Sequence, residues 1–182
     1  MEHTDEDLVA LYLLGKEEVF KDIVERYTSI LYNFTVRFVG GSNTQDILQD
    51  VFIKVWKNLK RFDKSKSSFK TWIFTITRNT ITDYLRKKKS INFSDLGNLE
   101  DSFIADIPDN VILPDKIIEK LEDAESLNRF LKKLPMSYQA VLVLYYQEEM
   151  TFAEIGESLG KPLNTVKSYH YRAIELLRKM IV

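Results

Sequence analysis

Apolar side chains recur at helical spacing along most of this chain, and this spacing constrains its fold more than any other feature. The pattern runs through residues 8–14, 19–38, 42–59, 69–88, 117–134 and 137–147. A repeat of three or four residues is typical of an amphipathic α-helix, whereas a half-buried strand alternates with a period of two. No segment shows that alternation, and no internal repeat is present. We therefore predict an all-α fold.

The helical pattern is lost between residues 90 and 115. This stretch contains Gly97, Pro108 and Pro114 among several Asp and Asn residues, a composition typical of a linker. With 182 residues, the chain is long enough for two small domains. We predict two small helical domains joined by an acidic linker, with the divisions 1–89, 90–116 and 117–182.

Charge is distributed in blocks that the net value of −1 conceals. Residues 1–89 carry a net charge of +4, residues 90–126 carry −8 and residues 127–182 carry +3. Two basic blocks flank an acidic one, so the block pattern says more about binding partners than the overall charge does.

Composition excludes several classes of protein. The chain has no cysteine, which rules out a disulfide scaffold and a Cys-based zinc site. Its two histidines, His3 and His170, are too far apart in sequence to show metal-ligand spacing, and we expect neither a metal nor a cofactor. The N-terminal residues are acidic and polar, and no apolar run approaches the roughly 20 residues that span a bilayer. We predict a cytoplasmic protein without membrane insertion.

Two contrasting segments adjoin between residues 46 and 89. Residues 46–56 carry carboxylates at their start, while residues 54–89 hold twelve Lys or Arg against two Asp. Aromatic residues lie among these basic residues, namely Trp56, Phe62, Phe69, Trp72, Phe74 and Tyr84. Positive charge attracts phosphates whatever the sequence, and aromatic rings offer surfaces on which unpaired bases stack. The combination predicts contact with a single nucleic-acid strand.

Capping patterns predict where the N-terminal helices begin. Thr4 with Asp7, and Ser42 with Gln45, fit a capping box in which the first side chain accepts from the backbone three residues later. The helix expected over residues 69–88 contains five threonines, which are mediocre helix formers. We therefore expect tertiary packing through its apolar residues Trp72, Ile73, Ile76 and Leu85 to stabilise it.

Residues 151–168 have the pattern of a helix-turn-helix. Thr151 with Glu154 fits a capping box, and Gly160 fits the left-handed position of the turn. Gly156 leaves room for a close approach of the second helix, and Asn164 is a plausible N-cap for that helix. Helical hairpins with Gly turns are also common as plain structural elements, but the net charge of +3 over the last 18 residues favours DNA binding.

Taken together, these segments resemble the sigma-70 superfamily of bacterial RNA polymerase sigma factors, in its compact extracytoplasmic-function-like group. The resemblance rests on residues 46–56 (DILQDVFIKVW), 69–79 (FKTWIFTITRN), 83–86 (DYLR), and Leu134-Pro135 followed by the helix-turn-helix. It implies a protein that is not an enzyme and that binds core RNA polymerase and promoter DNA. Many members of the group are also held by an anti-sigma factor, although no residue of this sequence marks such a surface.

The resemblance assigns residues to three sites. The helix that binds the clamp helices of the polymerase β′ subunit would carry Asp46, Gln49, Asp50, Phe52 and Trp56. Minus-ten recognition and melting would use the loop 61–68, which captures a flipped base, with contacts from Arg61, Lys66, Arg78, Asn79, Arg86, Lys87 and Lys88. Minus-thirty-five recognition, by the domain that also touches the β flap, would use Lys167, Ser168, Tyr171 and Arg172.

Structural alternatives remain open for several of these residues. Asp46 and Asp50 also suit the positive end of their helix, Trp56 fits a core position as well as a contact, and Asn79 could bond locally. Phe52 could also be core, and Phe69, Trp72 and Phe74 are more often core than stacking surfaces. Sigma factors of this group commonly have Arg-Leu-His-Arg where this chain has residues 169–172 (YHYR), which leaves the core side of the last helix uncertain. The acidic linker could occupy a basic RNA channel or serve as a solvated tether.

Two other classes of function compete with this hypothesis. The first is a helix-turn-helix repressor or activator that acts without polymerase docking, but this class leaves the basic, aromatic residues 54–89 unexplained. The second is an enzyme acting on nucleic acid. Asp46 and Asp50 form a close carboxylate pair, but no further acid or histidine lies near them in the sequence, so a two-metal or nucleophilic site is not indicated.

Overall fold

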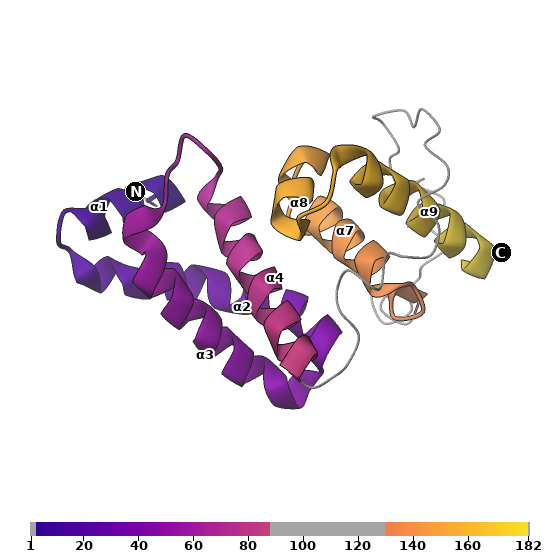
Figure 1. Ribbon diagram of the computed structural model, residues 1–182, viewed down its shortest axis with the longest axis horizontal. Coiled ribbons are helices and arrows are strands. Elements are labelled where there is room, and N and C mark those ends of the chain that lie inside the picture. Colours follow the sequence, from indigo (N-terminus) through magenta and orange to yellow (C-terminus); the bar gives the residue numbers. More distant parts are fainter. Residues whose placement is uncertain (1–2, 88–129, 182) are drawn as a thin grey trace. The chain divides into compact units, whose positions relative to one another are not determined.

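A computed structural model of the chain describes residues 3–87 and 130–181, which form two compact units (Figure 1). The N-terminal unit contains α1 (Asp5–Leu13), the 3₁₀ turn η1 (Glu17–Val19), α2 (Phe20–Val39), α3 (Gly41–Asn58), the 3₁₀ turn η2 (Leu59–Arg61) and α4 (Phe69–Lys87). The C-terminal unit contains α7 (Met136–Tyr146), α8 (Phe152–Leu159) and α9 (Leu163–Ile181). The described residues contain helices and no strand, which confirms the predicted all-α fold.

Some sequence predictions lie outside the described residues. These are the acidic linker, both of its boundaries, and all but the end of the helix expected over residues 117–134. Within the described ranges, no helix is both long enough and apolar enough to cross a bilayer.

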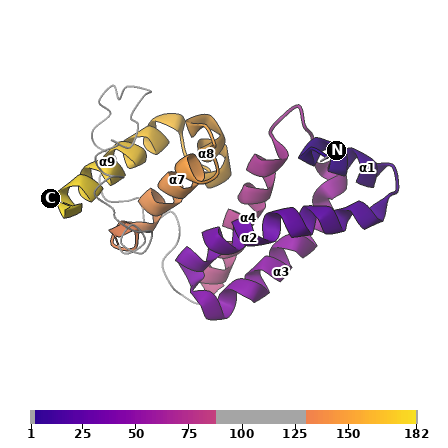
Figure 2. The same cartoon turned by 180° about the vertical axis from the view of Figure 1, so that it is seen from behind.

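The N-terminal unit is built around α3, which packs against both α2 and α4 (Figure 2). Phe34 of α2 and Phe74 of α4 meet edge to face with ring centroids 5.2 Å apart, and both are almost fully buried. Val51 and Val55 face the same interior from α3. Burial of these side chains supplies the packing energy that fixes the three helices.

The buried threonines of α4 are tolerated in the helix because their hydroxyls find partners within it. Thr71, Thr77 and Thr80 are buried. The hydroxyl of Thr77 donates to the carbonyl oxygen of Ile73 at 2.8 Å, and that of Thr80 donates to Ile76 at 2.8 Å. A buried hydroxyl with a partner avoids the desolvation penalty of an unpaired polar group. The expected apolar anchoring holds for Ile73 and Leu85, which are buried, whereas Trp72 and Ile76 are half-buried.

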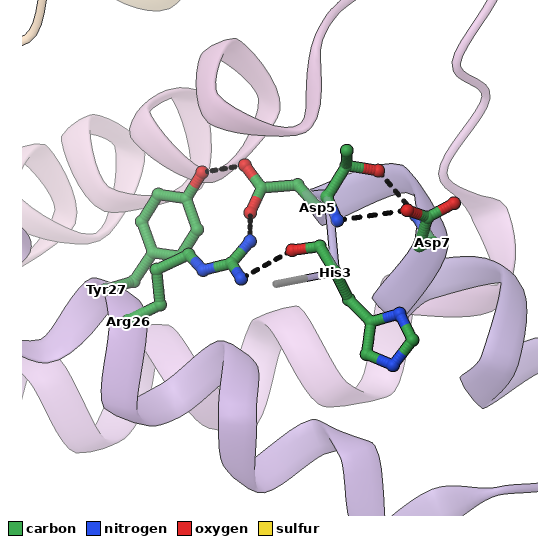
Figure 3. A network of polar contacts seen from close by, with 6 residues as sticks. His3, Asp5, Asp7, Arg26 and Tyr27 are labelled. Atoms are coloured by element: carbon green, nitrogen blue, oxygen red, sulfur yellow. Dashed lines mark hydrogen bonds and ion pairs between the residues drawn. The ribbon is translucent and has the colours of Figure 1, made fainter. Parts of the chain in front are cut away.

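The start of α1 is tied to α2 by a polar network (Figure 3). The predicted capping box of Thr4 and Asp7 is confirmed, since each side chain bonds the other residue's backbone N–H. The Asp5 carboxylate accepts hydrogen bonds from Arg26 and from the Tyr27 hydroxyl, both at 2.5 Å. Arg26 also donates to the backbone oxygen of His3 at 2.7 Å. Burial, followed by the bond to the Asp5 carboxylate, raises the pKa of Tyr27.

The capping box expected at Ser42 and Gln45 is wrong. Gly40, with φ of 74°, makes the whole reversal between α2 and α3, so α3 already begins at Gly41 and Ser42 lies inside its first turn. The side chain of Thr44 instead donates back to the Gly40 carbonyl oxygen at 2.8 Å, and Asn43 donates to that of Val39 at 3.2 Å. The Asn43 bond satisfies a carbonyl group at the end of α2 that lacks a partner in its own helix, whereas the Gly40 carbonyl also accepts from the N–H of Asn43 at 3.4 Å.

The helix-turn-helix of the C-terminal unit is formed by α8 and α9. Thr151 and Glu154 make the predicted capping box, and Gly160 adopts the predicted left-handed conformation with φ of 62°. A Cβ at Gly156 would lie 2.8 Å from the Lys161 carbonyl oxygen, so the close approach is made by the backbone of the turn.

The N-cap expected at Asn164 is also wrong. Helix α9 begins at Leu163, and the carbonyl oxygen of Pro162 accepts the first helical hydrogen bond, from the N–H of Val166, at 3.1 Å. Pro162 therefore takes the cap position, and Asn164 lies in the first turn of the helix.

Candidate partner-binding and nucleic-acid surfaces

The solvent side of α3 carries two carboxylates and two large apolar side chains. Asp46 and Asp50 are exposed, Ile53 is 42 % exposed and Trp56 is 50 % exposed. Gln49 is exposed among them, and all five are spaced by three or four residues, so they share one face of the helix. We call Asp46, Gln49, Asp50, Ile53 and Trp56 the α3 outer face.

The structure shows whether Trp56 and Phe52, which the sequence left open as core or surface residues, are buried. Trp56 does not belong to the core, because the buried side of α3 is formed by Ile47, Val51 and Val55. Phe52 is half-buried at the edge of this face. Ile53 was missed by the sequence reasoning, although its spacing from Gln49 and Asp50 would have placed it beside them.

Electrostatics make the α3 outer face suitable for a basic partner. Within the described part of the chain, neither Asp46 nor Asp50 forms an ion pair or hydrogen bond through its side chain. Both lie beyond the first turn of α3, so the helix dipole contributes little to stabilising their charge. Unpaired surface carboxylates beside exposed apolar groups favour a partner that is basic and partly apolar.

A groove of about 330 Å³ separates this face from α4. Lys54 crosses it, donating to the Thr80 hydroxyl at 3.0 Å and lying 3.8 Å from the Asp83 carboxylate. Asp83 in turn pairs with Arg86 at 3.0 Å. The contacts connect α3 to α4, and the groove presents both signs of charge.

The polar residues of α4 that we expect to contact DNA differ in their exposure to solvent. Asn79, Arg86 and Lys87 are exposed, whereas Arg78 is half-buried and burial lowers its pKa. Asn79 forms no hydrogen bond through its side chain within the described ranges, so the local bond considered as an alternative is not seen. Lys88, expected to contact the same strand, lies outside the described residues.

The loop of residues 61–68 is closed by its own polar groups. Asp63 accepts from the N–H of Ser65 at 3.0 Å and from its hydroxyl at 2.7 Å, and these bonds lower the pKa of Asp63. Lys66 is exposed and lies 3.6 Å from Asp63. Ser68 accepts from the N–H of Thr71 at 3.2 Å and so caps α4. Arg61, at the end of η2, is exposed.

Aromatic rings support the base of this loop. Phe62 lies 5.5 Å from Phe69 and 5.4 Å from Trp72, measured between ring centroids. Phe69 and Phe74 are buried and belong to the core, whereas Phe62 and Trp72 are half-buried. Of these four rings, Phe62 and Trp72 remain accessible to a base.

The exposed side of α9 carries a polar stripe. Tyr171 is 44 % exposed, and Lys167, Ser168 and Arg172 are half-buried. The opposite side, formed by Val166, Tyr169, His170, Ala173, Ile174 and Leu177, is buried. The core side of this helix, uncertain from the sequence, thus includes both Tyr169 and His170.

His170 is held neutral inside the C-terminal unit. Its Nε2 lies 2.9 Å from the Tyr146 hydroxyl, and its ring lies 5.2 Å from that of Phe152. Burial lowers the pKa of His170 to about 4. The residue is therefore a structural group of the unit and is not available to contact DNA.

Comparisons with known proteins agree with this arrangement. Residues 23–91 match the family described as Sigma-70 region 2, and residues 124–177 match Sigma-70, region 4. The chain is 33 % identical over 171 residues to the ECF RNA polymerase sigma factor SigW of Bacillus subtilis (strain 168), which covers 92 % of this chain and 91 % of SigW. It is 30 % identical over 164 residues to SigX of the same organism, covering 90 % of this chain and 84 % of SigX.

A solved structure shows the same fold. CnrH in complex with the cytosolic domain of CnrY matches with a TM-score of 0.64 and 23 % identity, over 95 % of this chain and 94 % of CnrH. The chain belongs to the sigma-70 family. Within it, the chain is a sigma factor of the ECF group, a protein that binds core RNA polymerase and directs it to promoters.

Proposed function

We propose that three surfaces of this sigma factor divide the work of initiation. The α3 outer face binds the clamp helices of the polymerase β′ subunit. The loop 61–68 and α4 hold the unpaired strand of the minus-ten element. Helix α9 reads the minus-thirty-five element in the duplex, and its domain touches the β flap. The corresponding domains are residues 1–89 and 117–182, with residues 90–116 as the linker.

The composition of the α3 outer face is the observation that carries this proposal. Its carboxylates have no internal partner within the described ranges, and Ile53 and Trp56 stay exposed although the buried side of the helix is fully packed. Exposed aromatic and aliphatic side chains beside uncompensated charge are typical of a binding surface. A helix that only supported the fold would not need them.

Strand capture by α4 needs no chemical fuel. Removing a base from the stack costs a few kcal/mol, and a stacking contact returns about 1–3 kcal/mol per base. Arg86 and Lys87 supply exposed positive charge for the phosphates, while Asn79 offers a free amide to a base edge. Because binding offsets melting, we assign no catalytic step to the chain.

Association with core RNA polymerase tests the docking surface. Asp50→Lys should weaken binding about tenfold or more, because it places positive charge against a basic partner. Asp22→Lys is the matched control, since Asp22 is an exposed carboxylate on α2. Analytical gel filtration with purified core enzyme measures the effect. Wild-type binding by Asp50→Lys, or an equal loss in the control, would remove the α3 outer face from the proposal.

Asn79→Ala and Lys167→Ala together test the division between strand capture and duplex reading. In the holoenzyme, Asn79→Ala should reduce the permanganate reactivity of unpaired thymines while the footprint over the upstream element persists. Lys167→Ala should weaken that upstream footprint first. The same pattern of loss in both variants would contradict separate roles for α4 and α9.

Two further proposals follow from the family. The protein acts in the cytoplasm, where RNA polymerase works. It is also open to control by an anti-sigma factor, a kind of partner supported by the solved complex of the sigma factor RpoE with the anti-sigma factor NepR from Bartonella quintana, which matches this chain with a TM-score of 0.63.

A further inference from the structure

Asn164 lies in the first turn of α9 and not at the N-cap position that its residue type predicts. Pro162 takes that cap position, so the Asn164 side chain does not serve as the N-cap. It is exposed, and within the described ranges it forms no hydrogen bond through its amide. An amide with one acceptor and two donor hydrogens is therefore available at the surface.

Asn164 extends the polar stripe of α9 toward the N-terminus of the helix. It precedes Lys167 by three residues, Ser168 by four and Tyr171 by seven, so all four lie on one side of the helix. The opposite side is buried. In a helix-turn-helix, the N-terminal residues of the second helix are the ones that contact base edges in the major groove.

Among the polar side chains of this stripe, an amide is the one suited to recognising adenine. The side-chain oxygen of an Asn accepts from the adenine N6 amino group while its NH₂ donates to adenine N7, so both contacts are made at once. A lysine contacts phosphates or guanine as a point charge, and a serine bonds any base. Since the Asn164 amide has no bond within the described protein to give up, this pairing carries little cost.

We propose that Asn164 is a specificity-determining residue of this sigma factor that selects an adenine in the upstream promoter element. The inference rests on the proposed reading of that element by α9. With a rise of 1.5 Å per residue, Asn164 and Tyr171 are separated by about 10 Å along the helix, which is roughly three base steps. The adenine selected by Asn164 is therefore a different base from the one beside Tyr171.

Selection from a promoter library with a randomised upstream element tests this role. Holoenzyme is formed from purified core RNA polymerase with the full-length protein, and bound DNA is separated and sequenced. Wild-type holoenzyme should prefer adenine at one position, and Asn164→Ala should lower that preference about 5- to 150-fold, the equivalent of about 1–3 kcal/mol. Preferences at the other positions should persist. Asn164→Arg should change the preferred base at the same position to guanine.

Gln147 provides the matched controls, because it is another exposed amide in the same unit. Gln147→Ala and Gln147→Arg should leave the base profile unchanged, which separates base reading from loss of an amide or gain of a charge. A uniform loss of affinity in Asn164→Ala would make Asn164 a phosphate contact and overturn the proposal, as would an unchanged profile. Failure of the wild-type protein to form holoenzyme, or to show any upstream preference, would overturn the proposed function itself.

Discussion

Helices α4 and α9 have the same length of 19 residues, and both are proposed to contact DNA, but they are anchored differently. The buried polar groups of α4 include Thr77 and Thr80, whose hydroxyls bond carbonyl groups of α4 itself. The buried polar group of α9 is His170, which depends on Tyr146 of α7. The two helices therefore bury polar side chains in different ways, and only α9 buries one that can take up a proton in mild acid when the unit unfolds.

Because of this difference, we expect the stability of the N-terminal unit to depend mainly on apolar packing and that of the C-terminal unit to depend also on pH. In α4 the apolar packing dominates, through Phe74 and Ile73, and the threonines add little that another residue of the same size could not supply. In α9 the packing includes an imidazole that must stay neutral. Acid should therefore destabilise the C-terminal unit in part through the protonation of His170.

The largest expected effect tests the packing of α4. Phe74→Ala should destabilise the N-terminal unit by about 3–5 kcal/mol, because a buried aromatic ring is removed from its contact with Phe34. Both tryptophans, Trp56 and Trp72, lie in this unit, so denaturant unfolding followed by tryptophan fluorescence reports on it directly.

Leu177→Ala in α9 is the control for this measurement. It removes a buried side chain of the C-terminal unit, so its cost should appear in circular dichroism and much less in tryptophan fluorescence. Equal shifts of the fluorescence transition in both variants would show that the two units do not unfold separately.

The second prediction concerns acid and His170. The pKa of His170 is lowered to about 4 in the folded unit from an ordinary value of 6.5. Below pH 6.5 the unfolded chain binds a proton that the folded unit does not, so stability is complete above this pH and falls until about pH 4. The loss should reach about 3 kcal/mol.

The variant His170→Leu isolates this contribution. Carboxylates also titrate in acid, but they are common to both proteins, so the difference between the two stability profiles belongs to His170. Unfolding of the C-terminal unit between pH 7 and 4, followed by near-ultraviolet circular dichroism of its tyrosines, should show a much flatter profile for His170→Leu. Parallel profiles would indicate that His170 is not a buried neutral group.

The smallest expected effect tests the threonines. Thr77→Val should change stability by no more than about 0.5 kcal/mol, because the hydroxyl bonds only its own helix and valine has nearly the same shape. Thr80→Val should cost more, since its hydroxyl also accepts from Lys54 at 3.0 Å. Thermal unfolding of the two variants makes this comparison, and a larger loss for Thr77→Val would contradict it.

The sequence predicted the helices better than their first residues. Periodicity located the helices because burial of one face determines it. The capping boxes at Thr4 and Thr151 were confirmed, but the capping box at Ser42 and the N-cap at Asn164 were wrong, since Gly40 and Pro162 take the cap positions of the following helices. A polar residue near a helix start predicts a cap only if no neighbour takes that position.

The sequence predicted which residues share a face of the candidate site, but not how exposed each of them is. The spacing of Asp46, Gln49 and Asp50 placed them on one face, and the structure agrees. Whether Trp56 faces solvent could not be derived, because a large apolar residue near Val55 fits either side until the packing of α2 and α4 is known. The exposure of Ile53 and the burial of His170 depend on the same tertiary contacts. The roles of these residues in binding remain predictions.

The bond network between Asp5, Arg26 and Tyr27 has a consequence for the dynamics of the first helix. A helix of only nine residues ordinarily frays, and its amides exchange rapidly with deuterium. In this chain the opening of α1 would require breaking charge-assisted bonds to α2. The α1 amides should therefore be protected almost as long as those at the start of α2, so that isotope labelling followed by mass spectrometry would detect the two segments opening together.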